Sequence, residues 1–203
     1  MRAVKGLGLL AALTIALGLV GAQPGRAAAY TTPQVAIRNL ANANVGRGPC
    51  TPTSQGGYFT APDGATSCAY PTFWCGEFTA WVWDKSGHVY ITSVGHTPTS
   101  IEHYGEINGN TSRRQAKKNV PPLVGDAVIF SSNDPSINKG SATHVGIVYY
   151  VDPSSHIVTV IAGNEGKGNG SVGVRTFDYS TLAKSSPTTQ DYWAYEYVTP
   201  RTH

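Results

Sequence analysis

The stretch over residues 70–85 constrains the fold more than any other part of the chain, because it joins helix signals to a dense run of apolar side chains. Pro71 and Thr72 favour the start of a helix, and Lys85 followed by Gly87 is typical of its end. Between them, apolar side chains recur at helical spacing, namely Cys75, Phe78 and Val82, with Trp81 beside them. The sequence therefore predicts a helix over residues 70–85 that is buried along one face and central to the domain.

Cys75 falls in the first turn of this predicted helix. Backbone N–H groups in a first turn have no partner within the helix, and the positive end of the helix dipole lies there, so a thiolate is favoured over a thiol. One interpretation of Cys75 is therefore a nucleophile. The other is a structural cysteine packed as a small apolar side chain, since free cysteine is among the most buried residue types.

The N-terminus has the pattern of a secretory signal. Arg2 and Lys5 precede an apolar run over residues 7–20, and small residues follow at 27–29. The run is too short, and too often interrupted by glycine, to be a convincing membrane span, and an uncleaved anchor is the alternative. We expect a signal peptide over residues 1–29, a single mature domain over 30–203, and a secreted protein.

The charge of the chain gives no argument for a nucleic-acid partner. Without the three cationic side chains of residues 1–29, the 15 Lys plus Arg fall to the same number as the 12 Asp plus Glu, so the mature net charge is near zero. One basic cluster remains, and we interpret it as a solvated loop with at most a weak role in holding an anionic polymer. It consists of Arg113, Arg114, Lys117 and Lys118.

The chain has three cysteines, so one stays unpaired if the other two bond. Cys50 and Cys68 lie in turn-rich segments, and a bond between them would close the intervening loop and stabilise the domain by about 3 kcal/mol on the chain-entropy model. Cys75 is then the free thiol. A thiol kept unpaired at a helix start in an oxidising compartment favours the nucleophile interpretation.

The order of the predicted elements indicates an α+β domain, with N-terminal helices packed on an antiparallel sheet. Helices are expected over residues 31–45 and 70–85, with a brief one near 99–104. Strands are expected over residues 127–130, 144–151, 156–162, 174–177 and 192–198, with a glycine-rich loop over 163–173.

A cysteine nucleophile needs a base within hydrogen-bond reach, and the base needs a group that orients it. Among six histidines, His144 alone starts a strongly apolar strand. In the predicted hairpin the end of the return strand lies opposite His144, which brings Asn164 near it. We expect the side-chain carbonyl of Asn164 to orient the imidazole. Glu165 is the rival, and the sequence Gly163-Asn164 is also an ordinary turn pair.

Four sequence blocks then occur in order: Trp74-Cys75-Gly76-Glu77-Phe78 with Trp81-Val82-Trp83, Gly125 to Phe130, Thr143 to Val148, and Gly163-Asn164. Together they resemble a CHAP domain (cysteine, histidine-dependent amidohydrolase/peptidase), and most of all the secreted single-domain forms of actinobacteria. The resemblance implies a papain-like fold and a hydrolase of bacterial cell walls. It carries over Cys75 as the nucleophile and His144 as the general base and acid.

One position departs from the family pattern. Many CHAP domains have an acidic residue two places before the asparagine, where it orients the histidine, and here that place is Ala162. Either Asn164 orients His144 instead, as an asparagine does in papain-like proteases, or the chain has only a weak orienting group for His144.

The resemblance implies hydrolysis of an amide bond in peptidoglycan, by an N-acetylmuramoyl-L-alanine amidase or a stem or cross-bridge endopeptidase. Tyr70 and Trp74 are candidates for substrate contacts, Tyr70 also for an oxyanion donor beside the N–H of Cys75, with core packing as the alternative. We expect a monomer bound to cell wall, without cofactor, metal, nucleic acid or stable membrane insertion. A cysteine peptidase acting on proteins and a weakly active wall-binding relative are the other function hypotheses.

Overall fold

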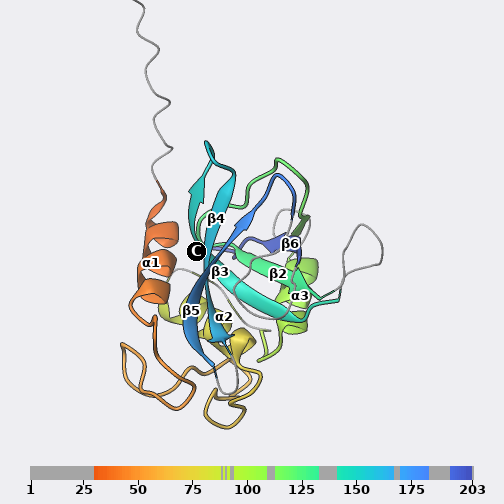
Figure 1. Cartoon of the computed structure of the whole chain (residues 1–203). Coiled ribbons are helices and arrows are strands. Elements are labelled where there is room, and N and C mark those ends of the chain that lie inside the picture. Colours follow the sequence, from red (N-terminus) through yellow and green to blue (C-terminus); the bar gives the residue numbers. More distant parts are fainter. Residues whose placement is uncertain are drawn as a thin grey trace, which may run out of the picture.

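Figure 1 shows the computed structural model of the chain, which describes residues 30–87, 89, 91, 94–108, 113–132, 141–166, 170–182 and 193–202. The predicted signal segment over residues 1–29 lies outside the described residues. Within the described part, three helices come first along the chain and six strands follow. The predicted α+β class is confirmed.

The strands form one antiparallel sheet in the order β1-β6-β2-β3-β4-β5. Their bounds are β1 (Arg113–Gln115), β2 (Ala127–Ser131), β3 (His144–Asp152), β4 (Ile157–Glu165), β5 (Ser171–Asp178) and β6 (Trp193–Val198). Strands β2 to β5 form the expected meander, whereas β6 returns to the far side of β2. The strand that begins with His144 is therefore paired on both sides and held in the middle of the sheet.

The helices are α1 (Thr32–Asn42), α2 (Cys75–Lys85) and α3 (Pro98–Ile107). α2 ends where the sequence predicts, but it begins at Cys75 rather than at residue 70, because residues 70–73 form a turn that leads into it. α3 is longer than expected, and the side chain of Thr97 caps it by accepting a hydrogen bond from the N–H of Ser100. Among the described residues, no helix is long and apolar enough to cross a membrane.

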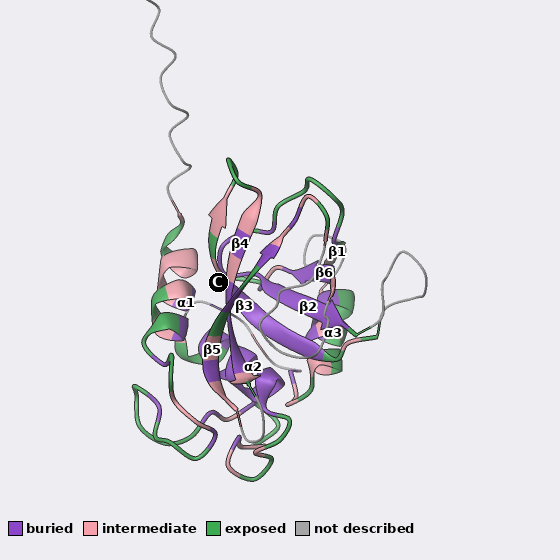
Figure 2. Cartoon of the chain, in the orientation of Figure 1, coloured by how far each residue is buried: buried purple, intermediate pink, exposed green. Residues whose placement is uncertain are grey.

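Helix α2 is the most buried helix and lies against β3 and β4 (Figure 2). Glycine at position 163 permits this approach, because an added Cβ would lie 2.7 Å from Cβ of Phe78 and 2.8 Å from the ring of Trp74. Ile147 of β3 and Ile161 of β4 belong to the same apolar cluster as Trp74 and Phe78. The contact fixes the start of α2 against the ends of the two strands where His144 and Glu165 lie.

Two sequence expectations about loops are wrong. Arg113 and Arg114 form part of β1 rather than a solvated loop, and Nη2 of Arg114 lies 2.5 Å from the buried carboxylate of Asp126. The predicted loop over 163–173 is shorter than expected at both ends, since β4 continues to Glu165 and β5 begins at Ser171. In both places the pairing with a neighbouring strand decides the structure, and single-sequence turn signals do not report such pairing.

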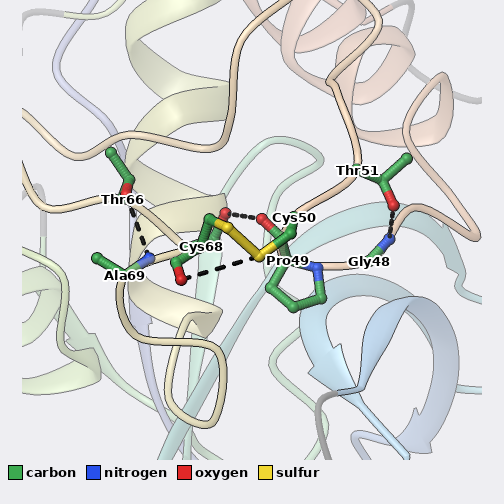
Figure 3. Close-up of a disulfide and its surroundings, with 8 residues drawn as sticks. Gly48, Pro49, Cys50, Thr51, Thr66, Cys68 and Ala69 are labelled. Atoms are coloured by element: carbon green, nitrogen blue, oxygen red, sulfur yellow. Dashed lines mark hydrogen bonds between the residues drawn. A yellow bond between two sulfur atoms is a disulfide. The ribbon is translucent and has the colours of Figure 1, made fainter.

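The predicted disulfide is confirmed, since Cys50 and Cys68 are bonded and Cys75 is the free, buried cysteine (Figure 3). The hydroxyl of Ser67 donates to the carbonyl of Pro49 at 2.5 Å and ties the same two segments together. The loop that precedes α2 is thus restrained at both ends.

Candidate active site

Cys75 is the first residue of α2 and is only 4% exposed. Trp74 at the N-cap offers no side-chain cap to the first-turn N–H groups. The carbonyl of Cys75 accepts a hydrogen bond from the hydroxyl of Thr79 at 3.1 Å, which adds to the helical restraint on its backbone. The sulfur therefore stands at the positive end of a buried helix, where the dipole and the free N–H groups favour negative charge.

The ring of His144, the first residue of β3, forms a hydrogen bond with the Cys75 side chain. Burial by itself lowers the pKa of His144, but the charge and hydrogen bond of Cys75, together with those of Glu165, outweigh burial and raise the pKa to about 9. A histidine beside a cysteine at the start of a helix is the arrangement of a nucleophile and its base.

The orienting group on His144 is Glu165, whose Oε1 lies 2.8 Å from Nε2 of the imidazole. An ionised carboxylate only accepts hydrogen bonds, so Nε2–H donates to it. Burial alone raises the pKa of Glu165, while its contacts with His144 and Arg175 bring that pKa below its usual range. With Nε2 occupied, Nδ1 is the ring nitrogen that remains for the thiol of Cys75.

Arg175 holds the other side of this carboxylate, since its guanidinium pairs with Oε2 of Glu165. Arg175 lies on β5, is 4% exposed, and has its guanidinium 5.8 Å from the ring centroid of Phe130. Gly173 leaves room for the contact, because an added Cβ there would lie 2.6 Å from Cβ of Glu165. Side chains from α2, β3, β4 and β5 thus form one chain of contacts that starts at the thiol.

The expectation that Asn164 orients His144 is wrong. Nδ2 of Asn164 donates instead to the carbonyl of Thr72 at 2.8 Å, in the turn before Cys75. The β3–β4 register, continued past Ile147 opposite Ile161, would place residue 164 opposite His144. On the other edge of β4, the pairing with β5 shifts between Ala162 and Glu165, and Asn164 in this bulge adopts a φ of 59°. The extra residue brings the side chain of Glu165 to the imidazole.

A sequence signal for this arrangement existed in β5. Arg175 lies on the same face of β5 as the buried Phe177. The residues that alternate with them, Val174 and Thr176, are exposed. A cation on the buried face of a strand requires a counter-charge, and Glu165 is that carboxylate. Asparagine also tolerates a left-handed backbone better than most residues, which is the turn interpretation of Gly163-Asn164.

Position 162, where many CHAP domains have an acidic residue that orients the histidine, is Ala162 in this chain. It is fully buried and packs against Gly146, where an added Cβ would lie 2.8 Å from Cβ of Ala162. The carboxylate beside the histidine comes from Glu165, beyond the bulge, rather than from position 162.

The two candidate substrate contacts differ. Trp74 is fully buried and stacks on Phe59 with a centroid distance of 5.4 Å, so it is a core residue and the expectation of a substrate contact is wrong. Tyr70 is 51% exposed and stacks on the ring of His96, with centroids 5.3 Å apart. Tyr70 therefore remains accessible to a ligand.

A family model described as the CHAP domain matches residues 65–164. The match includes Cys75, His144 and Asn164 and ends one residue before Glu165. CHAP domains are generally cysteine- and histidine-dependent amidohydrolases or peptidases, so the match supports a hydrolase. No curated protein and no solved structure matched the chain.

Proposed function

We propose that this protein is a secreted hydrolase that cleaves an amide bond in peptidoglycan through a cysteine acyl-enzyme. The observation that carries the proposal is the buried contact between Cys75, at the start of α2, and His144, which Glu165 holds from the other side. The CHAP match over residues 65–164 supports a peptidoglycan substrate. It also suggests a papain-like arrangement for the α+β fold.

In this mechanism the Cys75 thiolate attacks the amide carbonyl carbon and forms a tetrahedral oxyanion. The backbone N–H of Cys75 is positioned to donate to that oxyanion, a contribution of about 3–4 kcal/mol for such donors. Nδ1–H of the His144 imidazolium then protonates the leaving amine as the C–N bond breaks. Water attacks the thioester while His144 takes its proton, and the carboxylic acid leaves as the thiolate is restored.

Glu165 and Arg175 support this sequence without touching substrate. Glu165 keeps the proton on Nε2, which leaves Nδ1 facing the sulfur throughout the cycle. Together with His144, Arg175 lowers the pKa of Glu165, and it also fixes the second oxygen of that carboxylate. Cys75, His144 and Arg175 are buried and the side chain of Glu165 is 11% exposed, which makes these interactions stronger than they would be in water.

The test is digestion of purified peptidoglycan by the mature protein, residues 30–203, followed by mass spectrometry of the released fragments. A new stem N-terminus with free muramic acid carboxylate would identify an amidase, and new ends within the stem or cross-bridge would identify an endopeptidase. Cys75→Ala should release no fragments while keeping the wild-type circular dichroism spectrum. Release of fragments by Cys75→Ala at the wild-type rate would overturn the mechanism.

Two further arms separate the rival functions. Cleavage of denatured protein substrates without cleavage of peptidoglycan would favour a general cysteine peptidase. Binding to the wall without release of any fragment would favour a wall-binding protein. N-terminal sequencing of protein from the culture medium tests the predicted processing after residue 29.

A further inference from the structure

A hollow of about 400 Å³ opens beside the start of α2, outside the group of side chains that surrounds the thiol. Its wall is formed by residues 63–66 with Ala69, Tyr70 and His96. No lysine or arginine is among these residues, so the charged groups of the hollow are the carboxylate of Asp63 and, when it is protonated, the imidazole of His96 paired with it. The feature is therefore a small recess with one carboxylate and one aromatic side.

The recess adjoins the nucleophile through the backbone. An added Cβ on Gly76, the residue after Cys75, would lie 2.1 Å from the carbonyl oxygen of His96. The segment with His96 is thus in direct contact with the first turn of α2. Tyr70 belongs to the turn that leads into Cys75, and its ring stacks on that of His96 with an interplanar angle of 7°.

Asp63 is held in place but keeps capacity for a ligand. Its Oδ1 accepts the N–H of Ala65 at 2.9 Å, and its Oδ2 lies 3.1 Å from Nδ1 of His96. Although slight burial opposes the shift, these contacts lower the pKa of Asp63, which keeps it ionised at neutral pH. A carboxylate offers about four acceptor positions, and the N–H of Ala65, the ring of His96 and the backbone N–H of His96 take three, so one remains for a ligand.

The surroundings make this recess rigid. The N–H of Ala61 donates to the carbonyl of Ala65 at 2.9 Å, and the Cys50–Cys68 disulfide closes the same loop. A preformed recess with a carboxylate recognises a cation at low conformational cost.

We propose that this recess is a specificity subsite that binds a primary ammonium group of the wall peptide, with Asp63 as acceptor and the exposed Tyr70 ring beside it. The inference rests on the proposed function. An ammonium offers three donors and a compact charge, which suits a carboxylate with an open acceptor position next to an aromatic face. A divalent metal does not suit it, because the described residues contain no group of three or more His, Cys, Asp or Glu side chains able to hold one.

Wall peptides offer this chemistry from two sources, the side-chain amine of a diamino residue and a free N-terminus. The probes are therefore three synthetic stem peptides that share one sequence: unmodified, acetylated at the side-chain amine, and acetylated at the N-terminus. Calorimetry with Cys75→Ala protein measures binding without turnover. The test variant is Asp63→Asn, which retains the acceptor for the Ala65 N–H and removes the charge.

Glu106→Gln is the matched control, because Glu106 also pairs with a histidine, His103 at 3.3 Å, on exposed α3. Asp63→Asn should weaken binding of the unmodified peptide about tenfold, and Glu106→Gln should not change it. In the Cys75→Ala protein that retains Asp63, acetylation of the recognised amine should weaken binding by the same factor. Adding Asp63→Asn should then weaken binding of that acetylated peptide no further. In active enzyme the loss should fall on KM, with kcat unchanged.

Equal binding of all three peptides to the parent protein would overturn the subsite, and so would an equal loss for free and acetylated peptides in Asp63→Asn. Failure of the proposed function is a separate result, in which wild-type enzyme releases nothing from peptidoglycan while the binding experiment still reports on the recess.

Discussion

Oε1 of Glu165 lies 2.8 Å from Nε2 of His144, across a bulge in β4 that regular strand alternation does not predict. The contact decides which ring nitrogen carries a fixed proton and which one faces Cys75. It also makes the third group of the site a carboxylate with its own buried cation, Arg175, rather than an amide.

The first prediction compares the two neighbours in the bulge. Glu165→Gln should lower kcat/KM on the order of 10²–10⁴-fold, because an amide does not stabilise the imidazolium and permits the wrong tautomer. Asn164→Ala should cost less than about tenfold in activity and about 2 kcal/mol in stability, since it loses the bond to the Thr72 carbonyl and places alanine in a left-handed backbone. Steady-state kinetics and thermal unfolding check both. The reverse ranking would restore Asn164 as the orienting residue.

The second prediction concerns the alkaline limb of the pH profile. The pKa of His144 is raised to about 9 by Cys75 and Glu165 against the effect of burial, so the imidazolium that protonates the leaving amine is lost near that pH. We expect kcat/KM to fall with an apparent pKa close to 9. Glu165→Gln removes one cause of the rise and should move the limb to lower pH. An unmoved limb would mean that Glu165 has no electrostatic effect on the imidazole.

The third prediction tests Arg175. Arg175→Met keeps much of the side-chain volume but leaves Glu165 buried without its cation, so the pKa of that carboxyl should rise and kcat should fall. Arg175→Lys keeps the charge but lacks the bidentate geometry of a guanidinium, so its kcat should lie between those of Arg175→Met and wild type. The readout is kcat together with the pH profile. A loss of thermal stability in Arg175→Met with an unchanged profile would assign Arg175 a purely structural role.

The fourth prediction concerns Glu77, which is fully buried on α2 with no hydrogen-bond partner for its carboxylate oxygens among the described residues. Burial raises its pKa from 4.5 to about 7. The protonated Glu77 is tolerated in the core, so the free energy of unfolding is not reduced by this residue below pH 4.5. That free energy decreases as pH rises through about 7 and the buried carboxyl ionises. Glu77→Gln should raise stability at about pH 8 relative to wild type, on the order of 3 kcal/mol, with no gain at about pH 4. Denaturant unfolding at the two pH values measures this difference.

The fifth prediction separates the thiols. Native protein should react with one equivalent of iodoacetamide, at Cys75, and His144→Ala should slow that reaction because the thiolate loses its partner. Peptide mapping without reductant should recover Cys50 bonded to Cys68. Replacing both with serine should lower stability by about 3 kcal/mol. Alkylation at Cys50 or Cys68 in unreduced protein would contradict the pairing.

The sequence by itself determined the features that depend on local periodicity and on residue chemistry. Helical spacing located α2 and placed Cys75 in its first turn, and an apolar run located β3 with His144 at its start. The cysteine count and the turn-rich segments indicated the disulfide that the structure contains. Each of these signals is a matter of residue type and spacing along the chain, so the sequence by itself contains it.

Only the tertiary structure decided which side chain reaches His144 and which aromatic residues remain accessible. The bulge that brings Glu165 forward depends on the pairing of β4 with β5 and on the space left by Gly173. Trp74 becomes a core residue because Phe59, from the loop tied by the disulfide, stacks on it. A strand shifted by one residue exchanges the two faces of its side chains, and that shift is set by neighbours distant in sequence rather than by local propensity.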